Sequence, residues 1–150
     1  MLISNGPPNA QGLAAAGILI PARVGYPGIL ARKLGPQGAA LRSAMVQALL
    51  DTGAGISAID QRVLEELGLQ PVSIVSIGSA HGSNPHAVYS VLIDLLPVGP
   101  AMPTSMRLDP ITVIEADLSG QPQQMLLGRD VLSRLLLVYN GPSGIWNLAL

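Results

Sequence analysis

Short apolar runs separated by turn residues make up most of this sequence. Gly, Pro, Asn and Ser cluster between the runs, and these residue types favour turns for stereochemical reasons. Runs of this length are typical of β-strands, and many of them in succession predict an all-β domain built as a closed barrel or a sandwich. The predicted strands cover residues 17–24, 44–50, 71–78, 87–96, 105–108, 111–116, 136–139 and 145–150.

The apolar spacing becomes helical in the segment that follows residue 56. Asp60 stands where a helix N-cap satisfies free backbone N–H groups, and Gly68 stands where a left-handed residue ends a helix. The pattern therefore predicts a helix over Asp60–Leu67. A second short helix is expected over Val131–Leu135.

The first eleven residues carry a cluster of Gly, Pro and Asn in place of a regular apolar pattern. We therefore expect a flexible leader over residues 1–11 and a single domain over residues 12–150. A chain of 150 residues can bury one core but is too short for two domains of ordinary size.

The formal net charge of −1 offers no basis for binding nucleic acid, so no nucleic-acid partner is expected. Only 11% of the residues are charged and 49% are hydrophobic, which is apolar for a small solitary domain. A membrane-spanning helix would explain the surplus, but it needs about 20 apolar residues. The run Leu13–Ile20 ends at Pro21. We therefore expect no membrane span, and a buried interface between subunits instead.

The chain has no cysteine, which removes disulfides, thiolate nucleophiles and cysteine zinc sites. The two histidines, His81 and His86, have no carboxylate cluster beside them in the sequence, so we expect no metal site and no cofactor. No Lys or Arg precedes the first apolar run, which disfavours a signal peptide. We expect a cytoplasmic location, and a secreted or periplasmic one stays open.

Asp51-Thr52-Gly53-Ala54 directly follows an apolar run that ends at Leu50. A carboxylate at the end of a buried strand is shielded from bulk water. The Thr52 hydroxyl can brace such a loop, and Gly53 allows a tight turn and close approach. The alternative is an ordinary Asx-turn, in which Asp51 binds only its own backbone.

The chain resembles the retropepsin-like aspartic proteases over roughly residues 44–150. The order of the motifs along the chain is more specific than any motif alone. Four features carry the resemblance: Leu49-Leu50-Asp51-Thr52-Gly53-Ala54, the helical segment Asp60–Leu67, the Gly-rich hairpin at Ser79–Pro85, and Leu126-Leu127-Gly128-Arg129-Asp130-Val131-Leu132.

The resemblance implies a closed β-barrel with one or two short helices and a flap hairpin. It also implies an aspartic endopeptidase of a cellular or bacterial rather than a viral kind. The catalytic residue would be Asp51, present once per chain and doubled in a homodimer, because this chemistry needs two carboxylates that share a proton. Thr52 would hold the two loops together, and Gly53 and Ala54 would line the substrate cleft.

The resemblance further assigns a flap and a supporting element. In the family, the flap closes over an extended peptide substrate. Arg129 would form an internal salt bridge or hydrogen bond beneath the active-site loop, and Asp130 would cap the following helix. Viral members often have an Asp soon after the loop, but Gly55-Ile56 stands here, so another group must bind Arg129. The flap residues would be Gly78, Ser79, Ala80, His81, Gly82 and Ser83, and the supporting residues Gly128, Arg129 and Asp130.

The chain contains no Phe, so the cleft is expected to be aliphatic and to favour extended apolar peptides. Both histidines are expected to face solvent at the flap. In the family the terminal strands interleave at the dimer interface, which would bury Gly144–Leu150. Two alternatives stay open: a retropepsin-fold dimerisation or peptide-binding module with little turnover, and an unrelated β-barrel in which Asp51 only shapes a turn. The cleft residues considered are Ile56, Val75, Val91 and Ile114.

Overall fold

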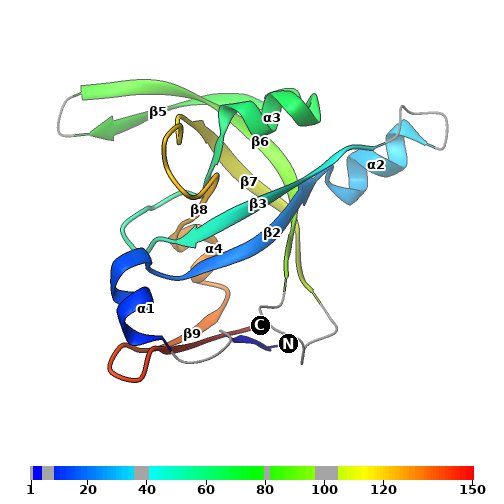
Figure 1. Ribbon diagram of the computed structural model, residues 1–150. Coiled ribbons are helices and arrows are strands. Elements are labelled where there is room, and N and C mark those ends of the chain that lie inside the picture. The colour runs from blue at the N-terminus through cyan, green and yellow to red at the C-terminus, as the bar shows by residue number, and fades with distance from the viewer. Residues whose placement is uncertain (1, 5–8, 36–40, 80–81, 97–104) are drawn as a thin grey trace.

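The computed structural model describes residues 2–4, 9–35, 41–79, 82–96 and 105–150 (Figure 1). In chain order, the elements are β1 (Leu2–Ser4), α1 (Ala10–Ala16), β2 (Leu19–Gly25), α2 (Gly28–Leu34), β3 (Ser43–Leu50), β4 (Ala58–Asp60), α3 (Gln61–Leu67), β5 (Ser73–Ser79), β6 (Gly82–Leu95), β7 (Met106–Ala116), β8 (Met125–Leu127), α4 (Arg129–Leu132), β9 (Leu136–Asn140) and β10 (Ile145–Ala149).

The larger sheet is a closed barrel. Among the described residues its strand order is β2-β3-β8-β4-β7-β6-β5, and an additional pairing of β2 with β6 closes it. β5 lies outside the closed part, where it pairs with β6 alone and forms a hairpin that extends beyond the barrel at the upper left of Figure 1. The prediction of an all-β closed barrel with a hairpin and short helices is confirmed.

Alternation of side chains explains why these segments are strands. In β3, Ala44, Val46 and Ala48 are buried, while the residues between them are exposed. Successive side chains of a strand point to opposite faces, so this pattern turns one face of β3 to the core and the other to solvent. The core inside the barrel is aliphatic, with Ile20, Ile93 and other residues at 0% exposure.

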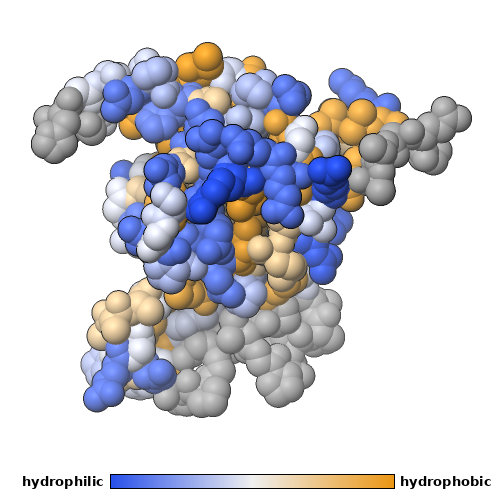
Figure 2. All heavy atoms as spheres, turned by 45° about the horizontal axis from the view of Figure 1, so that its top comes forward, coloured by the Kyte–Doolittle hydropathy of each residue, from blue (hydrophilic) through white to orange (hydrophobic). Residues whose placement is uncertain are grey.

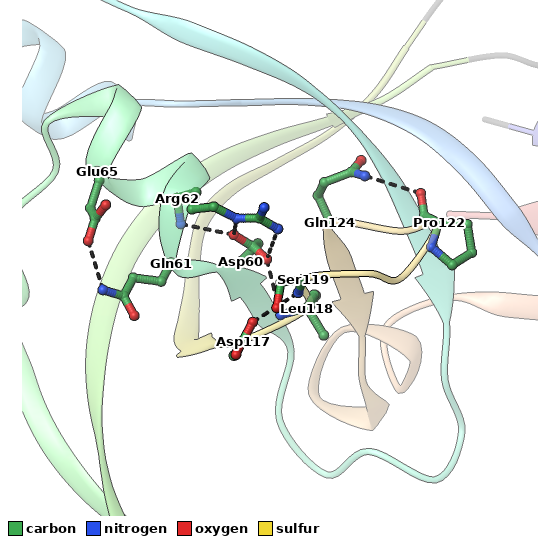
Figure 3. A network of polar contacts seen from close by, with 9 residues as sticks. All are labelled: Asp60, Gln61, Arg62, Glu65, Asp117, Leu118, Ser119, Pro122 and Gln124. Atoms are coloured by element: carbon green, nitrogen blue, oxygen red, sulfur yellow. Dashed lines mark hydrogen bonds and ion pairs between the residues drawn. The ribbon is translucent and has the colours of Figure 1, made fainter.

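Helix α3 begins and ends where the sequence predicts. The Asp60 carboxylate accepts a hydrogen bond of 2.9 Å from the backbone N–H of Arg62, and Gly68 ends the helix with a left-handed conformation. Figure 3 shows that Asp60 also accepts from the Leu118 N–H at 3.0 Å and pairs with the Arg62 guanidinium. Asp60 therefore joins the start of α3 to the turn after β7.

The second sheet contains both ends of the chain. It has the order β1-β10-β9, and all its pairings are antiparallel. Ile3 of β1 and Leu148 of β10 are paired and fully buried. The prediction of a flexible leader over residues 1–11 is therefore wrong for residues 2–4, whose strand pairs with β10, and for residues 10–11, which start α1 behind an Asn9 cap.

Two short helices were not predicted. α1 has a single buried residue, Leu13, and α2 has none, so neither shows a helical apolar pattern. The two strands expected at 105–108 and 111–116 form the single strand β7, which continues through Asp109-Pro110. The second helix begins at Arg129, two residues before its expected start at Val131.

Large apolar side chains are exposed in several regions, including Val72 and Ile74 at β5, which are 64% and 71% exposed. One is α2 with the segment after it, where Ile29 is 59% exposed and Leu34 and Leu41 are 44% and 46% exposed. Figure 2 shows this region as orange residues at its right-hand side, beside α2. Another is β9, where Leu136, Val138 and Tyr139 are 65%, 48% and 53% exposed. No helix of the described residues is long and apolar enough to cross a membrane.

Candidate active site

Asp51 lies at the point where β3 leaves the barrel. β3 runs parallel to β8, with Leu50 opposite Leu127, and the Asp51 N–H donates to the Leu127 carbonyl oxygen at 2.9 Å. This bond extends the strand pairing by one residue and fixes the backbone of Asp51. The carboxylate is half-buried at the end of a buried strand, as the sequence pattern indicated.

The loop folds back onto the Asp51 carboxylate. Oδ1 accepts hydrogen bonds from the N–H groups of Gly53 at 2.8 Å and Ala54 at 3.3 Å. A Cβ on Gly53 would lie 3.0 Å from the same oxygen, so the tight turn leaves no comfortable room for a side chain. Among the described residues Oδ2 has no hydrogen-bond donor. One oxygen is thus held by the loop and the other is available for chemistry.

Arg129 braces the loop from the opposite side. Its Nη1 donates to the carbonyl oxygens of Thr52 at 2.7 Å and Gly53 at 3.1 Å, and its backbone N–H donates to Ala54 at 2.9 Å. These carbonyls take the place of the carboxylate partner that Gly55-Ile56 lacks. Among the described residues, Arg129 therefore forms hydrogen bonds with the loop and no salt bridge.

Ser57 is a supporting residue that the sequence analysis missed. It is fully buried; its hydroxyl donates to Asp130 Oδ1 at 2.8 Å, and its backbone N–H donates to Oδ2 at 3.0 Å. The Gly128 N–H in turn donates to the Ser57 hydroxyl oxygen at 3.0 Å. No local pattern signals this role, because Ser57 stands in a segment whose apolar spacing resembles a helix.

Asp130 is not the helix N-cap. Helix α4 starts at Arg129, with Gly128 as its N-cap, and the Asp130 carboxylate accepts hydrogen bonds from Ser57 and from the Val131 N–H. Gly128 itself packs against the backbone, where a Cβ would lie 2.8 Å from the carbonyl carbon of Ile56. Gly128 and Asp130 thus fix the position of Ile56 and Ser57, the segment that follows the Asp51 loop and leads into β4.

A hollow of about 370 Å³ opens beside the loop, and its walls are almost entirely apolar. Ile56 and Ile114 line it, as expected. Val91 does not, because it is fully buried in the barrel core. Val75 is half-buried and lies on the same face of β5 as Ile77, which does line the hollow. The lining residues are Ala54, Gly55, Ile56, Ala58, Ile77, Ile114, Ala116 and Leu126.

The hairpin of β5 and β6 carries the residues assigned to a flap. Gly78 pairs with Ser83, and Ser79 pairs with Gly82, whose φ of +122° suits glycine. Ala80 and His81 lie outside the described residues. Ile77, just before this end of the hairpin, faces the Asp51 loop across the hollow.

His86 is not at the solvent-facing tip. It pairs with Val75 on the cleft side of the hairpin, is half-buried, and its Nδ1 lies 3.2 Å from the Glu115 carbonyl oxygen. A carbonyl only accepts, so Nδ1 carries the proton in this contact. The prediction of a solvated His86 is therefore wrong, because β6 continues through this residue.

The geometry places one carboxylate per chain at this loop. Thr52 and Gly53, on either side of the loop tip, are exposed, while Asp51 is half-buried. Water activation with protonation of a carbonyl requires a second acid. Among the described residues of one chain, no other carboxylate lies in the hollow.

The family is shown by comparison with known sequences. The family model described as "Aspartyl protease" matches residues 39–131, more than half of the chain. The chain therefore belongs to the aspartyl protease family. A comparison with curated proteins finds no match.

Solved structures show a similar fold. A retropepsin-like aspartic protease from Rickettsia conorii is similar with a TM-score of 0.53 and 13% identity, covering 99% of this chain and 88% of that one. The simian foamy virus (mac) protease is similar with a TM-score of 0.45 and 15% identity, covering 77% of this chain and 92% of that one. The retroviral protease-like domain of Ddi1 from Leishmania major is similar with a TM-score of 0.42 and 16% identity, covering 82% of this chain and 80% of that one. The fold is retropepsin-like.

Proposed function

We propose that this chain is an aspartic endopeptidase whose active site forms between two copies of the chain, each contributing Asp51. The observation that carries the proposal is the state of the Asp51 loop. The loop is fixed from behind by Leu127 and Arg129, yet its tip at Thr52 and Gly53 is exposed. A second copy facing this tip brings the missing carboxylate.

Two carboxylates a few ångströms apart cannot both ionise, so the pair holds one proton. The ionised Asp51 accepts a proton from a water molecule, and the oxygen of this water attacks the peptide carbonyl carbon. The protonated Asp51 donates to the carbonyl oxygen, giving a tetrahedral diol. The Asp51 that now carries the proton donates it to the amide nitrogen while the other Asp51 accepts a proton from a diol hydroxyl, so the C–N bond breaks and yields an acid and an amine. The pair again holds one proton.

The substrate is an extended peptide with apolar side chains beside the cleaved bond. The hollow beside Asp51 is lined by aliphatic side chains and small residues, so burying an aliphatic side chain there gains free energy while burying a charged one costs it. The β5–β6 hairpin borders the hollow through Ile77. Its edge strand β5 has backbone groups that can pair with an extended peptide.

Cleavage of a mixed peptide library by the purified chain tests the proposal. Mass spectrometry of products between about pH 4 and 6, the range in which acid dyads work, should reveal cuts beside apolar residues. Asp51→Asn should lower the rate by at least about a hundredfold, because acid–base catalysis contributes that much. Glu66→Gln, the same chemical change on an exposed residue of α3, should cleave normally.

Two results would contradict the proposal. Equal cleavage by the wild-type chain and Asp51→Asn would mean that another group performs the reaction. A folded dimer that binds peptides but cuts none at any pH would instead indicate a binding module of the same fold.

A further inference from the structure

The charges of this chain are distributed unevenly along the sequence. Residues 1–50 contain four of the eight Lys and Arg residues and none of the nine Asp and Glu residues. All nine acidic residues therefore lie in residues 51–150, and the net charge of −1 conceals a positive first third. Such an asymmetry within one chain indicates an anionic partner for the positive part. The four cations are Arg23, Arg32, Lys33 and Arg42.

The fold gathers these cations at one end of the β2–β3 ribbon. The two strands are antiparallel, with Gly25 opposite Ser43, so α2, which follows β2, lies beside Arg42, which precedes β3. Figure 1 shows α2 at the right, away from the flap hairpin. The Gly28 N–H donates to both carboxylate oxygens of Asp109 at 3.1 Å. This contact with β7 fixes the start of α2 on the barrel.

The cations of this region are not neutralised within the chain. Among the described residues neither Arg32 nor Lys33 forms an ion pair, and both side chains are exposed. Arg42 Nη1 donates to the backbone carbonyl oxygen of Glu66 at 3.2 Å, which is an uncharged partner. Three positive charges are therefore available to an anionic partner at the α2 end of the ribbon.

Large apolar side chains are exposed among these cations. Ile29 and Leu34 of α2 and Leu41 before β3 are each at least 44% exposed. Figure 2 shows their region in orange, with hydrophilic residues in blue directly beside it. An apolar groove of about 420 Å³ separates α2 from residues 68–72. The α2 surface, defined as Ile29, Arg32, Lys33, Leu34, Leu41 and Arg42, thus mixes positive charge with exposed aliphatic side chains.

We propose that the α2 surface binds an anionic lipid membrane. Its cations attract the headgroups, and its aliphatic side chains enter the boundary between headgroups and acyl chains. One weak signal alone gives marginal membrane binding, so the combination of charge and apolar contact is needed. A nucleic acid would engage the cations but leave the aliphatic side chains exposed to water, which is why the mixture favours lipid.

The proposal orients the chain on the membrane. β3 begins at Ser43 beside the α2 surface and ends at Leu50, next to Asp51. Eight strand residues span about 25 Å. The Asp51 loop is therefore held away from the lipid and stays accessible to peptides. The α2 surface shares no residue with the hollow beside Asp51, so the proposal does not depend on the proposed function.

Flotation with lipid vesicles tests the charge requirement. The purified chain should bind vesicles of phosphatidylcholine with phosphatidylserine at least tenfold more tightly than vesicles of phosphatidylcholine alone, and added salt should weaken the binding. Arg32→Gln should weaken it roughly fivefold and Arg32→Gln with Lys33→Gln roughly twentyfold, since each cation near the surface contributes about a factor of five. Arg134→Gln, the same change on an exposed arginine after α4, should bind normally.

A second pair of variants tests the apolar requirement. Leu34→Ser should weaken binding to the phosphatidylserine vesicles roughly tenfold, because part of a leucine side chain no longer leaves water. Leu136→Ser, the same change on an exposed residue of β9, should bind normally. Urea unfolding should show equal stability for the variants and the wild type, so that weaker binding is not a loss of fold.

Four results would overturn the proposal. They are no binding to either vesicle, equal binding to both, normal binding by the Arg32 and Lys33 double variant, and displacement by soluble glycerophosphoserine, which would indicate a site for one small anion. Binding to soluble polyglutamate without binding to vesicles would indicate an acidic protein partner and would overturn it too.

The same variants separate this proposal from the proposed function. Asp51→Asn should bind phosphatidylserine vesicles as the wild type does, and the Arg32 and Lys33 double variant should cleave soluble peptides normally. A chain that binds vesicles but cuts no peptide would refute only the protease proposal. A chain that cuts peptides but ignores vesicles would refute only the membrane proposal.

Discussion

The Arg129 guanidinium lies 2.7 Å from the carbonyl oxygen of Thr52, seventy-seven residues earlier in the chain. It also donates to Gly53, so a single side chain holds both residues at the tip of the Asp51 loop. Because Asp51 is bonded within the same loop, the position of its carboxylate depends on Arg129. Arg129 is thus a positioning residue.

Arg129→Met should lower the proposed protease activity more than it lowers stability. The exposed hydrogen bonds contribute about 1 kcal/mol to the free energy of unfolding. Small displacement of a catalytic group costs roughly tenfold to a hundredfold in rate, so kcat should fall while KM changes little. Peptide cleavage and urea unfolding measure the two effects. Arg134→Met, an exposed arginine after α4, should change neither.

Gly128→Ala should destabilise the fold. The new Cβ would lie 2.8 Å from the carbonyl carbon of Ile56 and 3.0 Å from the Ser57 nitrogen, both backbone atoms that move only with the strand. Such overpacking costs about 1–3 kcal/mol, measurable by urea unfolding. Gly25→Ala is the matched control, because its nearest contacts of 3.7 and 3.8 Å are ordinary ones. Equal stability of the two variants would contradict the packing argument.

Asp60→Asn should remove an acid-sensitive part of the stability. The hydrogen bond from Arg62, together with backbone N–H donors, lowers the pKa of Asp60 to about 2, below its ordinary 3.8. A depressed carboxyl pKa stabilises the fold above the unfolded value and loses this effect as pH falls through the folded value. The variant should lose about 1–2 kcal/mol at neutral pH.

The difference between wild type and Asp60→Asn should therefore shrink as the pH falls from about 4 to 2. Urea unfolding across this pH range measures it. Glu66→Gln serves again as the control. A difference that stays constant down to pH 2 would mean that the Asp60 charge is not what stabilises the start of α3.

Ile77→Ala should weaken cleavage of apolar peptides. Ile77 lines the hollow beside Asp51, so truncation removes apolar contact with a bound side chain. The loss should be roughly tenfold in kcat/KM, as expected for a few buried methylene groups. Ile74→Ala on the opposite face of β5, where Ile74 is 71% exposed, should cleave normally. An equal effect of both variants would place the substrate elsewhere.

The sequence predicts local features well and distant pairings poorly. Asp60 and Gly68 identify the ends of α3, because caps act on neighbouring backbone groups. The short helices α1 and α2 bury almost nothing, so no periodic pattern marks them. No local pattern marks β1 as a strand, because the strand that pairs with it, β10, is at the other end of the chain.

In the candidate site too, local motifs can be predicted from the sequence, whereas contacts between distant residues cannot. Asp51 and Arg129 stand in motifs of unusual residue types, which the sequence analysis recognised. That Arg129 binds the carbonyls of the Asp51 loop follows from the parallel pairing of β3 with β8, which no local pattern states. Ser57 was missed for the same reason, since its partners Gly128 and Asp130 are more than seventy residues away.

These long separations also set the order in which the site can form. Closing a loop of seventy residues costs chain entropy that only later contacts offset, so such contacts form late in folding. A ribosome delivers Asp51 well before Gly128 and Arg129, and until they arrive nothing holds the Thr52 and Gly53 carbonyls. The Asp51 loop therefore takes its final shape only after most of the barrel around it has been synthesised.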